Sequence, residues 1–214
     1  MSGPRGMVLA GVLGFLLAGC ATVEIWGPRV VTGQVTDQAG QPVADSPVLI
    51  VARSLDHAEF RMQYVEQGRQ EVRATTDAQG RYRIEFVPAK VGNNFYLFFY
   101  DKTGFDRVKY RAPESLDITS PLKQDRVVTL NQVLQLQVTW PEVERQIAFY
   151  EPDSDRGKLL RRHGLPDKRE TSGTGDGASE VWWYYADGVS YWFTGDNLAR
   201  THEFPPIPGA IPPK

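Results

Sequence analysis

Residues 76–86, TDAQGRYRIEF, decide the fold of the first half of this chain. Tyr82, Ile84 and Phe86 alternate with charged residues, which is the two-residue period of a strand with one buried face. The preceding Asp77-Ala78-Gln79-Gly80 has turn chemistry, because aspartate accepts backbone hydrogen bonds and glycine takes a positive φ. The stretch therefore predicts a turn followed by a half-buried strand.

Similar signals recur on both sides of this stretch. A second turn, Asp37-Gln38-Ala39-Gly40, follows an alternating segment, and residues 47–52 form a continuous apolar run. Further strands are expected at 31–37, 47–52, 72–76, 95–100, 107–111, 126–130 and 134–138. Residues 54–71 form a long polar segment, and we interpret them as an insertion or a long connection, partly helical. Short strands at this spacing predict an antiparallel β-sandwich over residues 30–139.

The two turns also carry a family resemblance. The hallmark of the carboxypeptidase regulatory-like family is a strand, an Asp-x-x-Gly turn with proline close behind, and a later Thr-Asp-x-x-Gly-x-Tyr. Residues 36–40 with Pro42, and residues 76–80 with Tyr82, resemble it. The resemblance covers about residues 30–138. It implies a seven-stranded sandwich of transthyretin-like type and a non-catalytic module of exported proteins. Neither turn has the dense oxygen ligands of a calcium loop.

The N-terminus has the layout of a secretory signal. Arg5 precedes an apolar stretch, residues 7–18, that is too short to span a bilayer. The run Leu17-Ala18-Gly19-Cys20 resembles the lipobox of bacterial lipoproteins. The resemblance implies cleavage between Gly19 and Cys20, lipidation of Cys20, a signal peptide at 1–19 and a tether at 20–29. The alternatives are an ordinary cleaved signal with a chance cysteine and an uncleaved anchor.

Ala21 bears on sorting. In Gram-negative lipoproteins an aspartate at this place commonly retains the chain in the inner membrane, whereas alanine permits export. We therefore expect the bacterial cell envelope and, in a Gram-negative source, the outer membrane facing the periplasm.

After Trp140 the pattern becomes helical. Pro141 suits the first turn of a helix over 141–149. Residues 153–155 can cap a second helix that runs to His163, and Gly164 ends it. We interpret His163 as helix-end decoration, because no nucleophile or carboxylate constellation surrounds it in the sequence.

Residues 181–204 predict a three-stranded meander, with Asp187-Gly188 as a hairpin turn. Trp182 would face the helix, while Trp183, Tyr185 and Trp192 would face the other way. The expected register pairs Tyr184 with Tyr191, Trp182 with Phe193, and Trp183 with Trp192.

Residues 140–204 resemble a second family, the small BamE-type lipoprotein (SmpA/OmlA) of the outer-membrane β-barrel assembly machinery. The matching residues are Leu160, Gly164, Pro166, Asp167, Trp182, Tyr184, Tyr191 and Phe193. The resemblance implies a small α+β unit and an assembly-machinery role. A proline-rich tail, residues 205–214, follows it. The predicted fold class is thus mainly β, a sandwich followed by a small α+β unit.

Charge and composition bear on the kind of function. Lys plus Arg is 24 and Asp plus Glu is 26, a net charge of −2, so there is no basic surplus for a nucleic-acid partner. Three histidines, His57, His163 and His202, lie far apart, and no Gly-x-Ser-x-Gly elbow is present. The glycine-rich loop 171–179 leads into a strand, which disfavours phosphate binding there. We expect no enzyme, no cofactor and no metal site.

The function we expect is that of a membrane-anchored, non-catalytic envelope lipoprotein. Its partners would be the membrane, through the N-terminal lipid, and an envelope protein complex. The candidate interaction surface is Trp183, Tyr185 and Trp192. The alternatives are a carbohydrate-binding module using exposed aromatics, a hydrolase with an unrecognised site, and a patch that merely packs against the sandwich.

Overall fold

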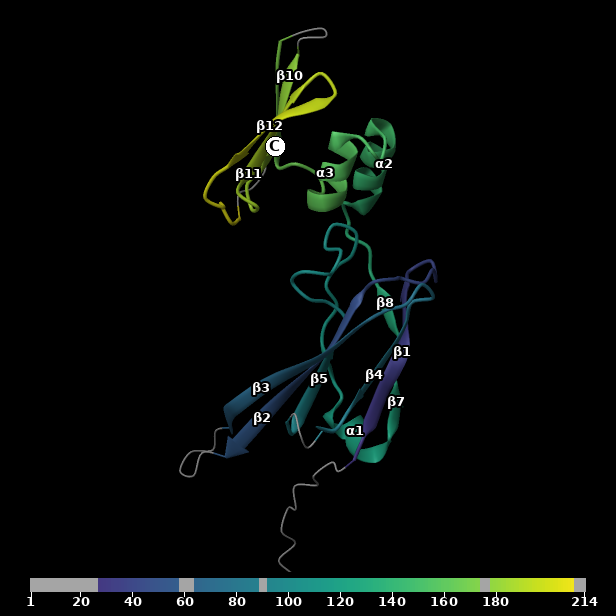
Figure 1. Ribbon diagram of the computed structural model, residues 1–214. Coiled ribbons are helices and arrows are strands. Elements are labelled where there is room, and N and C mark those ends of the chain that lie inside the picture. The colour runs from purple at the N-terminus through teal and green to yellow at the C-terminus, as the bar shows by residue number, and fades with distance from the viewer. Residues whose placement is uncertain (1–26, 58–63, 89–91, 174–177, 210–214) are drawn as a thin grey trace, which may run out of the picture.

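The computed structural model of the chain (Figure 1) describes residues 27–57, 64–88, 92–173 and 178–209. These residues form two units, a β-sandwich and a smaller unit of two helices and a four-stranded sheet. Each unit has its own apolar core. The mainly β fold, a sandwich followed by an α+β unit, is therefore confirmed. Within the described residues no helix has the length and apolar character needed to cross a membrane.

The first sheet of the sandwich is organised around β1 (Arg29–Asp37). This strand pairs antiparallel with β4 (Arg81–Phe86) and parallel with both β7 (Val127–Thr129) and β8 (Gln132–Leu134). The expectation of a wholly antiparallel sandwich was therefore wrong in this sheet. The chain between β7 and β8 runs on beside β1 without reversing, since Leu130 N donates to Thr32 O at 2.8 Å.

The second sheet lies across the core from the first and has the order β3-β2-β5-β6. Its members are β2 (Pro47–His57), β3 (Tyr64–Thr75), β5 (Asn94–Phe98) and β6 (Leu116–Asp117). Helix α1 (Thr119–Gln124) lies at the end of the sandwich where β1 begins (Figure 1). The described residues of the sandwich thus form two four-stranded sheets, one strand more than the family resemblance implies.

The alternation predicted for residues 81–86 is confirmed in β4. Tyr82, Ile84 and Phe86 are buried in the core, and the charged residues between them are exposed. The Tyr82 ring meets Phe99 edge to face at 5.7 Å, and its hydroxyl donates to Leu130 O at 2.7 Å. One strand therefore ties the two sheets together.

The turn before β4 is built as the sequence predicts. Asp77 Oδ1 accepts the backbone N–H groups of Gln79 and Arg81 at 2.9 and 2.8 Å. These bonds, that of Arg81 first, hold the pKa of Asp77 below its usual value. Gly80 has φ +70°, and a Cβ there would lie 2.4 Å from Val35 O, so only glycine fits.

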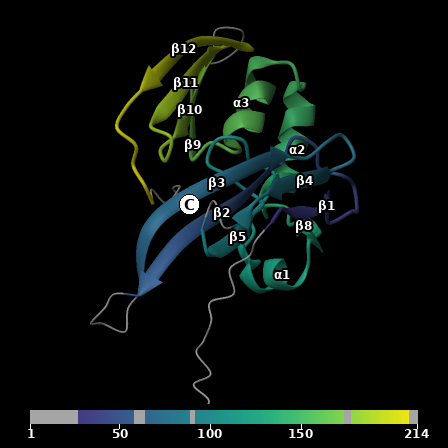
Figure 2. The ribbon, with the colours of Figure 1, turned by 60° about the horizontal axis from the view of Figure 1, so that its bottom comes forward.

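The interpretation of residues 54–71 as a partly helical insertion or long connection was wrong. Strands β2 and β3 form one long hairpin, paired from Pro47 with Thr75 to His57 with Tyr64. The hairpin extends beyond the rest of its sheet (Figure 2), and residues 66–71 are exposed. Both faces of this extension meet solvent, so the sequence has no apolar alternation there.

Two other strand predictions need correction. Residues 107–111 form a loop with a single bridge, Tyr110 to Leu136, rather than a strand. The last strand, β8, ends at Leu134, and Val138 is exposed. The alternation over 134–138 therefore belongs to a connecting segment.

The predicted helices of the second unit are confirmed. They are α2 (Trp140–Tyr150) and α3 (Asp155–His163). Ser154 caps α3 by accepting the Gly157 N–H at 3.0 Å. Gly164 ends it with φ +79° and donates to Leu160 O at 2.9 Å.

The sheet of this unit has four strands in the order β12-β11-β10-β9. Its members are β9 (Lys168–Ser172), β10 (Ser179–Tyr184), β11 (Val189–Thr194) and β12 (Asn197–Glu203). The expected three-stranded meander lacked β9. The sequence of β9, KRETS, is polar and mostly exposed, so it gives no strand pattern.

The hairpin register also differs from the prediction. Trp182 pairs with Tyr191, and Tyr184 pairs with Val189. The connection is therefore four residues, Tyr185 to Gly188, closed by Gly188 N donating to Tyr185 O at 3.2 Å. A slip of two residues leaves every side chain on its predicted face, because the period of a strand is two.

Trp182 is the centre of the second core. It is fully buried, and its ring meets Tyr150 at 5.6 Å and Phe193 at 5.1 Å. The guanidinium of Arg169, a residue of β9, lies 4.5 Å from the centroid of the Trp182 ring. Leu159 and Leu160 of α3 belong to the same apolar cluster as Trp182. Trp182 thus joins the sheet to the helices that cover it.

We predict that Trp182→Ala lowers the free energy of unfolding of the second unit by about 3–5 kcal/mol, because it leaves a large cavity in a small core. Urea melts followed by circular dichroism measure the change. Phe149→Ala serves as the control, since Phe149 of α2 is 78% exposed. A Trp182→Ala melt that overlays the wild-type curve would contradict the assigned core.

Candidate interaction surface

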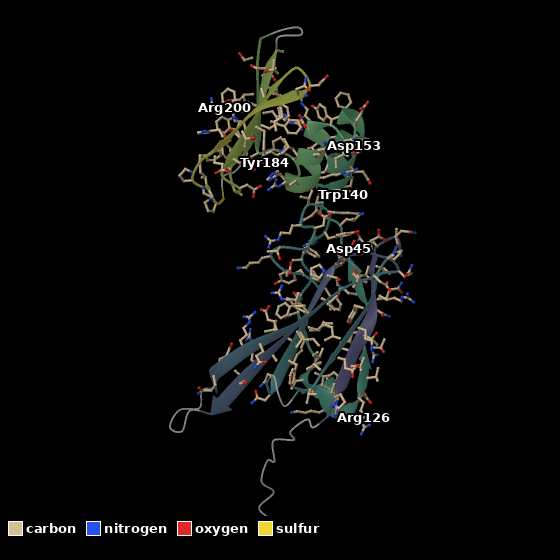
Figure 3. All side chains as sticks on the ribbon, viewed as in Figure 1. Asp45, Arg126, Trp140, Asp153, Tyr184 and Arg200 are labelled. Carbon is tan, nitrogen blue, oxygen red and sulfur yellow. The ribbon has the colours of Figure 1, made fainter. Side chains whose placement is uncertain are left out.

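The β9–β12 sheet has one side that faces away from α2 and α3, and we call this side the outer face. Strand alternation places it directly: Trp182 and Tyr184 point to the helices, so Trp183 and Tyr185 point away. Pairing adds the neighbours from the other strands, which are Lys168, Glu170, Ser190, Trp192, Arg200 and His202. Figure 3 shows Arg200 on the side of the sheet opposite the helices.

An aromatic cluster occupies one end of the outer face. The rings of Trp183 and Tyr185 are stacked, with centroids 6.2 Å apart and an interplanar angle of 26°. Phe204, just after β12, contacts Trp183 at 5.8 Å and Tyr185 at 6.3 Å. The sequence prediction named the first two residues. Phe204 joins them because β12 returns beside β11.

A polar edge borders this cluster on β9. Trp183 Nε1 donates to Glu170 Oε2 at 3.2 Å, and Lys168 pairs with the same carboxylate. The Lys168 hydrogen bond, followed by that of Trp183, lowers the pKa of Glu170. The hydrogen bond to Glu170 thus fixes the orientation of the Trp183 indole before any ligand arrives.

Trp192 lies on the same face but outside the cluster. Trp192 is paired across the sheet with Val181 of β10 and Arg200 of β12, and its Nε1 donates to Ser190 Oγ at 3.3 Å. It is 38% exposed. The predicted pairing of Trp183 with Trp192 was wrong, since Trp183 pairs with Ser190.

The outer face is not the contact with the sandwich. That contact runs through Val108, which packs into the second core, and through Lys109, whose ammonium lies 5.5 Å from the Trp140 ring. Figure 3 shows Trp140 at the junction of the two units. The alternative in which Trp183 and Trp192 are both buried against the sandwich is therefore wrong.

His163 has a more specific role than sequence reasoning gave it. Its Nδ1 lies 2.6 Å from Asp187 Oδ2, and its Nε2 lies 2.9 Å from the Tyr191 hydroxyl. The ring also packs on Tyr184 at 4.9 Å. The end of α3 is thus joined to the β10–β11 hairpin by an Asp–His–Tyr chain whose members are 24 and 28 residues from His163.

The chemistry of the Asp–His–Tyr group favours a structural role for these three side chains. Burial raises the pKa of Tyr191, and more strongly that of Tyr184, which opposes formation of a phenolate nucleophile. Tyr184 OH donates to Gly164 O at 3.1 Å, so it caps the same helix end. The group fixes the hairpin against α3.

Arg156 is a second anchor that sequence reasoning missed. It is 6% exposed and binds Glu180 at 3.1 Å, Asp196 at 3.2 Å and Gly195 O at 2.8 Å. Its guanidinium lies 4.4 Å from the Phe193 ring. No sequence pattern marks it, because its partners come from two different strands and a turn.

Gly19 and Cys20 lie outside the described residues. Among the described residues no group of three or more His, Cys, Asp and Glu side chains is arranged to hold a metal ion.

No family model matches the chain, and no curated protein matches it. Solved structures match about half of it. The streptococcal ancillary pilin is 18% identical over 50% of this chain and 32% of its own, with a TM-score of 0.30. Catechol 1,2-dioxygenase from Pseudomonas arvilla C-1 is 13% identical over 53% of each chain, with a TM-score of 0.32.

The minor pilin of Streptococcus agalactiae is 15% identical over 54% of this chain and 47% of its own, with a TM-score of 0.31. The chain thus spans from about a third to about half of the length of these three proteins. At these identities and TM-scores the likeness carries no argument about what the chain does.

We predict that Tyr191→Phe lowers the free energy of unfolding of the second unit by about 1–2 kcal/mol, because His163 Nε2 loses its partner in a buried site. Thermal or urea melts measure it. Tyr96→Phe is the matched control, since no hydrogen bond of the Tyr96 hydroxyl is found in the described part of the chain. Equal melts for the two variants would show that the Asp–His–Tyr chain does not stabilise the unit.

Proposed function

We propose that the chain is a non-catalytic lipoprotein of the bacterial envelope, anchored through Cys20, whose outer face binds a protein of an envelope complex. The observation that carries the proposal is the aromatic outer face: Trp192, which is exposed, and Trp183 and Tyr185, which are half-buried, lie on one side of a sheet whose other side is already covered. The kinship of the units with carboxypeptidase regulatory-like and BamE-type domains is part of the same proposal.

The composition of the outer face suits a protein partner. Tryptophan, tyrosine and arginine dominate binding energy at protein interfaces, and Trp183, Tyr185 and Arg200 provide all three types on one face. A pure sugar platform does not need the mixed charges of Lys168, Glu170 and Arg200 around it. Those charges can instead set the orientation of a protein partner.

The anchor would hold the outer face away from the bilayer. Residues 20–28 reach at most about 30 Å when fully extended. β1 starts at the end of the sandwich that carries α1, and the second unit lies at the opposite end (Figure 1). A chain tethered at Cys20 therefore presents the outer face to the surrounding compartment rather than to lipid.

The anchor makes a direct prediction. Cys20→Ala should abolish fatty-acid labelling and release the protein from the membrane fraction or block its processing, because stable anchoring needs two or more acyl chains. Metabolic labelling with a clickable fatty acid in the native host measures it. Equal labelling of wild type and variant would refute the lipid anchor. Sedimentation with inner-membrane markers would refute outer-membrane sorting.

The binding surface makes a second prediction. The double variant Trp183→Ala/Trp192→Ala should keep most of the stability of the protein and lose its crosslinked partner, since neither ring belongs to the core and interface aromatics contribute strongly to binding. Pull-down of the full chain from crosslinked cells measures the partner yield. Phe149→Ala is the matched control, because it removes an exposed aromatic ring from α2 instead.

Three results would count against the surface. Undiminished capture by the double variant places the partner elsewhere. An equal loss of crosslinked partner in Phe149→Ala shows that the capture reports nonspecific hydrophobic binding. Saturable binding of envelope polysaccharide that the double variant loses, with no protein captured, favours the carbohydrate-binding alternative.

A further inference from the structure

A polar cleft lies at the junction of the two units. It has a volume of about 320 Å³, within the range of small-molecule sites. One wall is the loop 102–108, between β5 and β6, and the other is the last turn of α3. Figure 1 shows this loop reaching from the sandwich to the foot of α3.

Cationic side chains dominate both walls. Lys102 and Arg107 come from the loop, and Arg161 and Arg162 come from α3. Asp106 is the one carboxylate of the lining, and its Oδ1 is occupied by the backbone N–H groups of Val108 and Lys109 at 3.1 and 2.9 Å. The cleft therefore has a strongly positive balance in a chain whose net charge is −2.

None of these four cationic groups forms an ion pair or a side-chain hydrogen bond with any residue that the structure describes. Two other arginines of the sandwich do form ion pairs. Arg73 binds Glu71 at 2.5 Å and Asp101 at 3.3 Å, and Arg81 binds Asp77 at 3.0 Å. Four like charges gathered without counter-charges repel one another, and an anion between them removes that cost.

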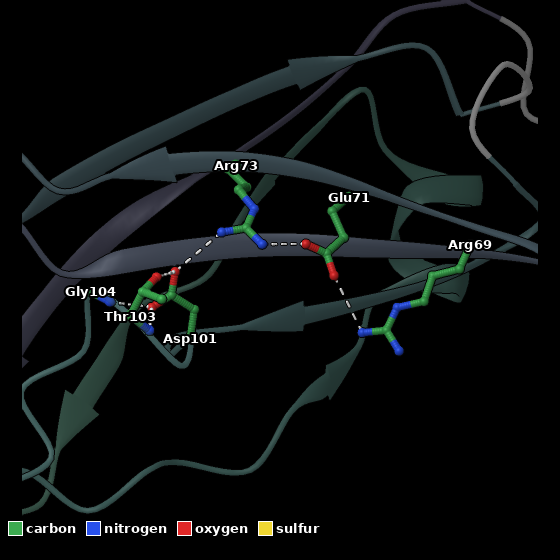
Figure 4. A network of polar contacts seen from close by, with 6 residues as sticks. All are labelled: Arg69, Glu71, Arg73, Asp101, Thr103 and Gly104. Atoms are coloured by element: carbon green, nitrogen blue, oxygen red, sulfur yellow. Dashed lines mark hydrogen bonds and ion pairs between the residues drawn. The ribbon is translucent and has the colours of Figure 1, made fainter. Parts of the chain in front are cut away.

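The loop wall is held in shape by its own polar network (Figure 4). Asp101 Oδ1 accepts the N–H groups of Gly104 at 2.5 Å and Thr103 at 2.9 Å, and Arg73 binds the other oxygen. The bond from Gly104 is the main reason that the pKa of Asp101 lies below its usual value. Lys102 and Arg107 thus project from a loop that is formed before a ligand arrives.

The opposite wall is equally fixed. The end of α3 is bound to the β10–β11 hairpin through His163, the residue directly after Arg162. Gln137 bonds the carbonyls of Arg107 and Tyr110 at 3.1 and 3.3 Å, which ties the loop to the segment that enters α2. Two braced walls therefore face each other across a positively charged space.

From this arrangement we infer a binding site for a multiply charged oxyanion, of the phosphate monoester class. Arginine forks match the geometry of phosphate oxygens, and a lysine adds a point charge. A single carboxylate would leave most of the positive charge unbalanced. The ligand would touch both units, so its binding would stabilise their junction. The site is separate from the outer face and does not rest on the proposed function.

The test is calorimetric titration of the full chain, in non-ionic detergent, with two phosphate monoesters, glycerol 3-phosphate and glycerol 2-phosphate. We expect saturable binding that weakens between about 0.05 and 0.3 M salt and raises the melting temperature. Arg161→Gln/Arg162→Gln should weaken it by about tenfold or more, because each arginine makes charge-assisted bonds. Lys102→Gln/Arg107→Gln, on the other wall, should do the same.

Arg126→Gln is the matched control. It removes an exposed arginine from the far end of the sandwich (Figure 3) and should leave binding unchanged. Circular dichroism melts verify that each variant folds.

A second arm presents the same phosphate monoester as phosphatidic acid in vesicles. Binding of the free compounds, with or without vesicle binding, supports the site. Vesicle binding without free-ligand binding overturns it in favour of a charged membrane contact. No binding by the wild type, or equal weakening by Arg126→Gln, also overturns it.

Discussion

The two-residue period of β10 and β11 is the constraint on which the second unit depends. It sends Trp182, Tyr184 and Phe193 into the core and Trp183, Tyr185 and Trp192 to the outer face. The same backbone therefore makes the core and the candidate binding surface. No residue can be moved from one to the other by a slip of two, whereas a slip of one would exchange the two faces completely.

The helix α3 links this sheet to the rest of the molecule. Its first turn carries Arg156, whose buried guanidinium binds Glu180 and the turn at Gly195. Its end carries His163, held by Asp187 and Tyr191. Because both ends of the helix are fixed to the sheet, the last turn presents Arg161 and Arg162 in a defined place against the loop 102–108. The cationic cleft is thus a consequence of how the helix is anchored.

Local patterns in the sequence predicted much of this structure. The β4 alternation, the aspartate turns, the Ser154 cap and the glycine that ends α3 all depend on residues within a few positions of one another. The faces of Trp183, Tyr185 and Trp192 were predictable for the same reason. Features without a local pattern were missed: the exposed β2–β3 hairpin, the polar strand β9, and the parallel partners of β1.

The sites that sequence reasoning missed join distant segments. The Asp–His–Tyr chain spans up to 28 residues, Arg156 reaches Asp196 across 40, and the cleft combines residues 102–107 with 161–162. Each cation there is unremarkable in its own segment. Only the fold brings them together. The predicted register of the β10–β11 hairpin was wrong for a different reason, because Asp187-Gly188 is part of a four-residue connection.

Hydroxyl-radical footprinting, in cells and on the purified full chain, tests most directly whether the outer face is both exposed by the fold and covered by a partner. In the purified protein, Trp183, Tyr185 and Trp192 should oxidise faster than Trp182 and Phe193. In cells the three outer residues should be protected, while Phe149 on α2 keeps its reactivity. Equal oxidation of the outer residues in cells and in the purified protein would contradict a partner on this face, and fast oxidation of Trp182 would contradict the fold that creates it.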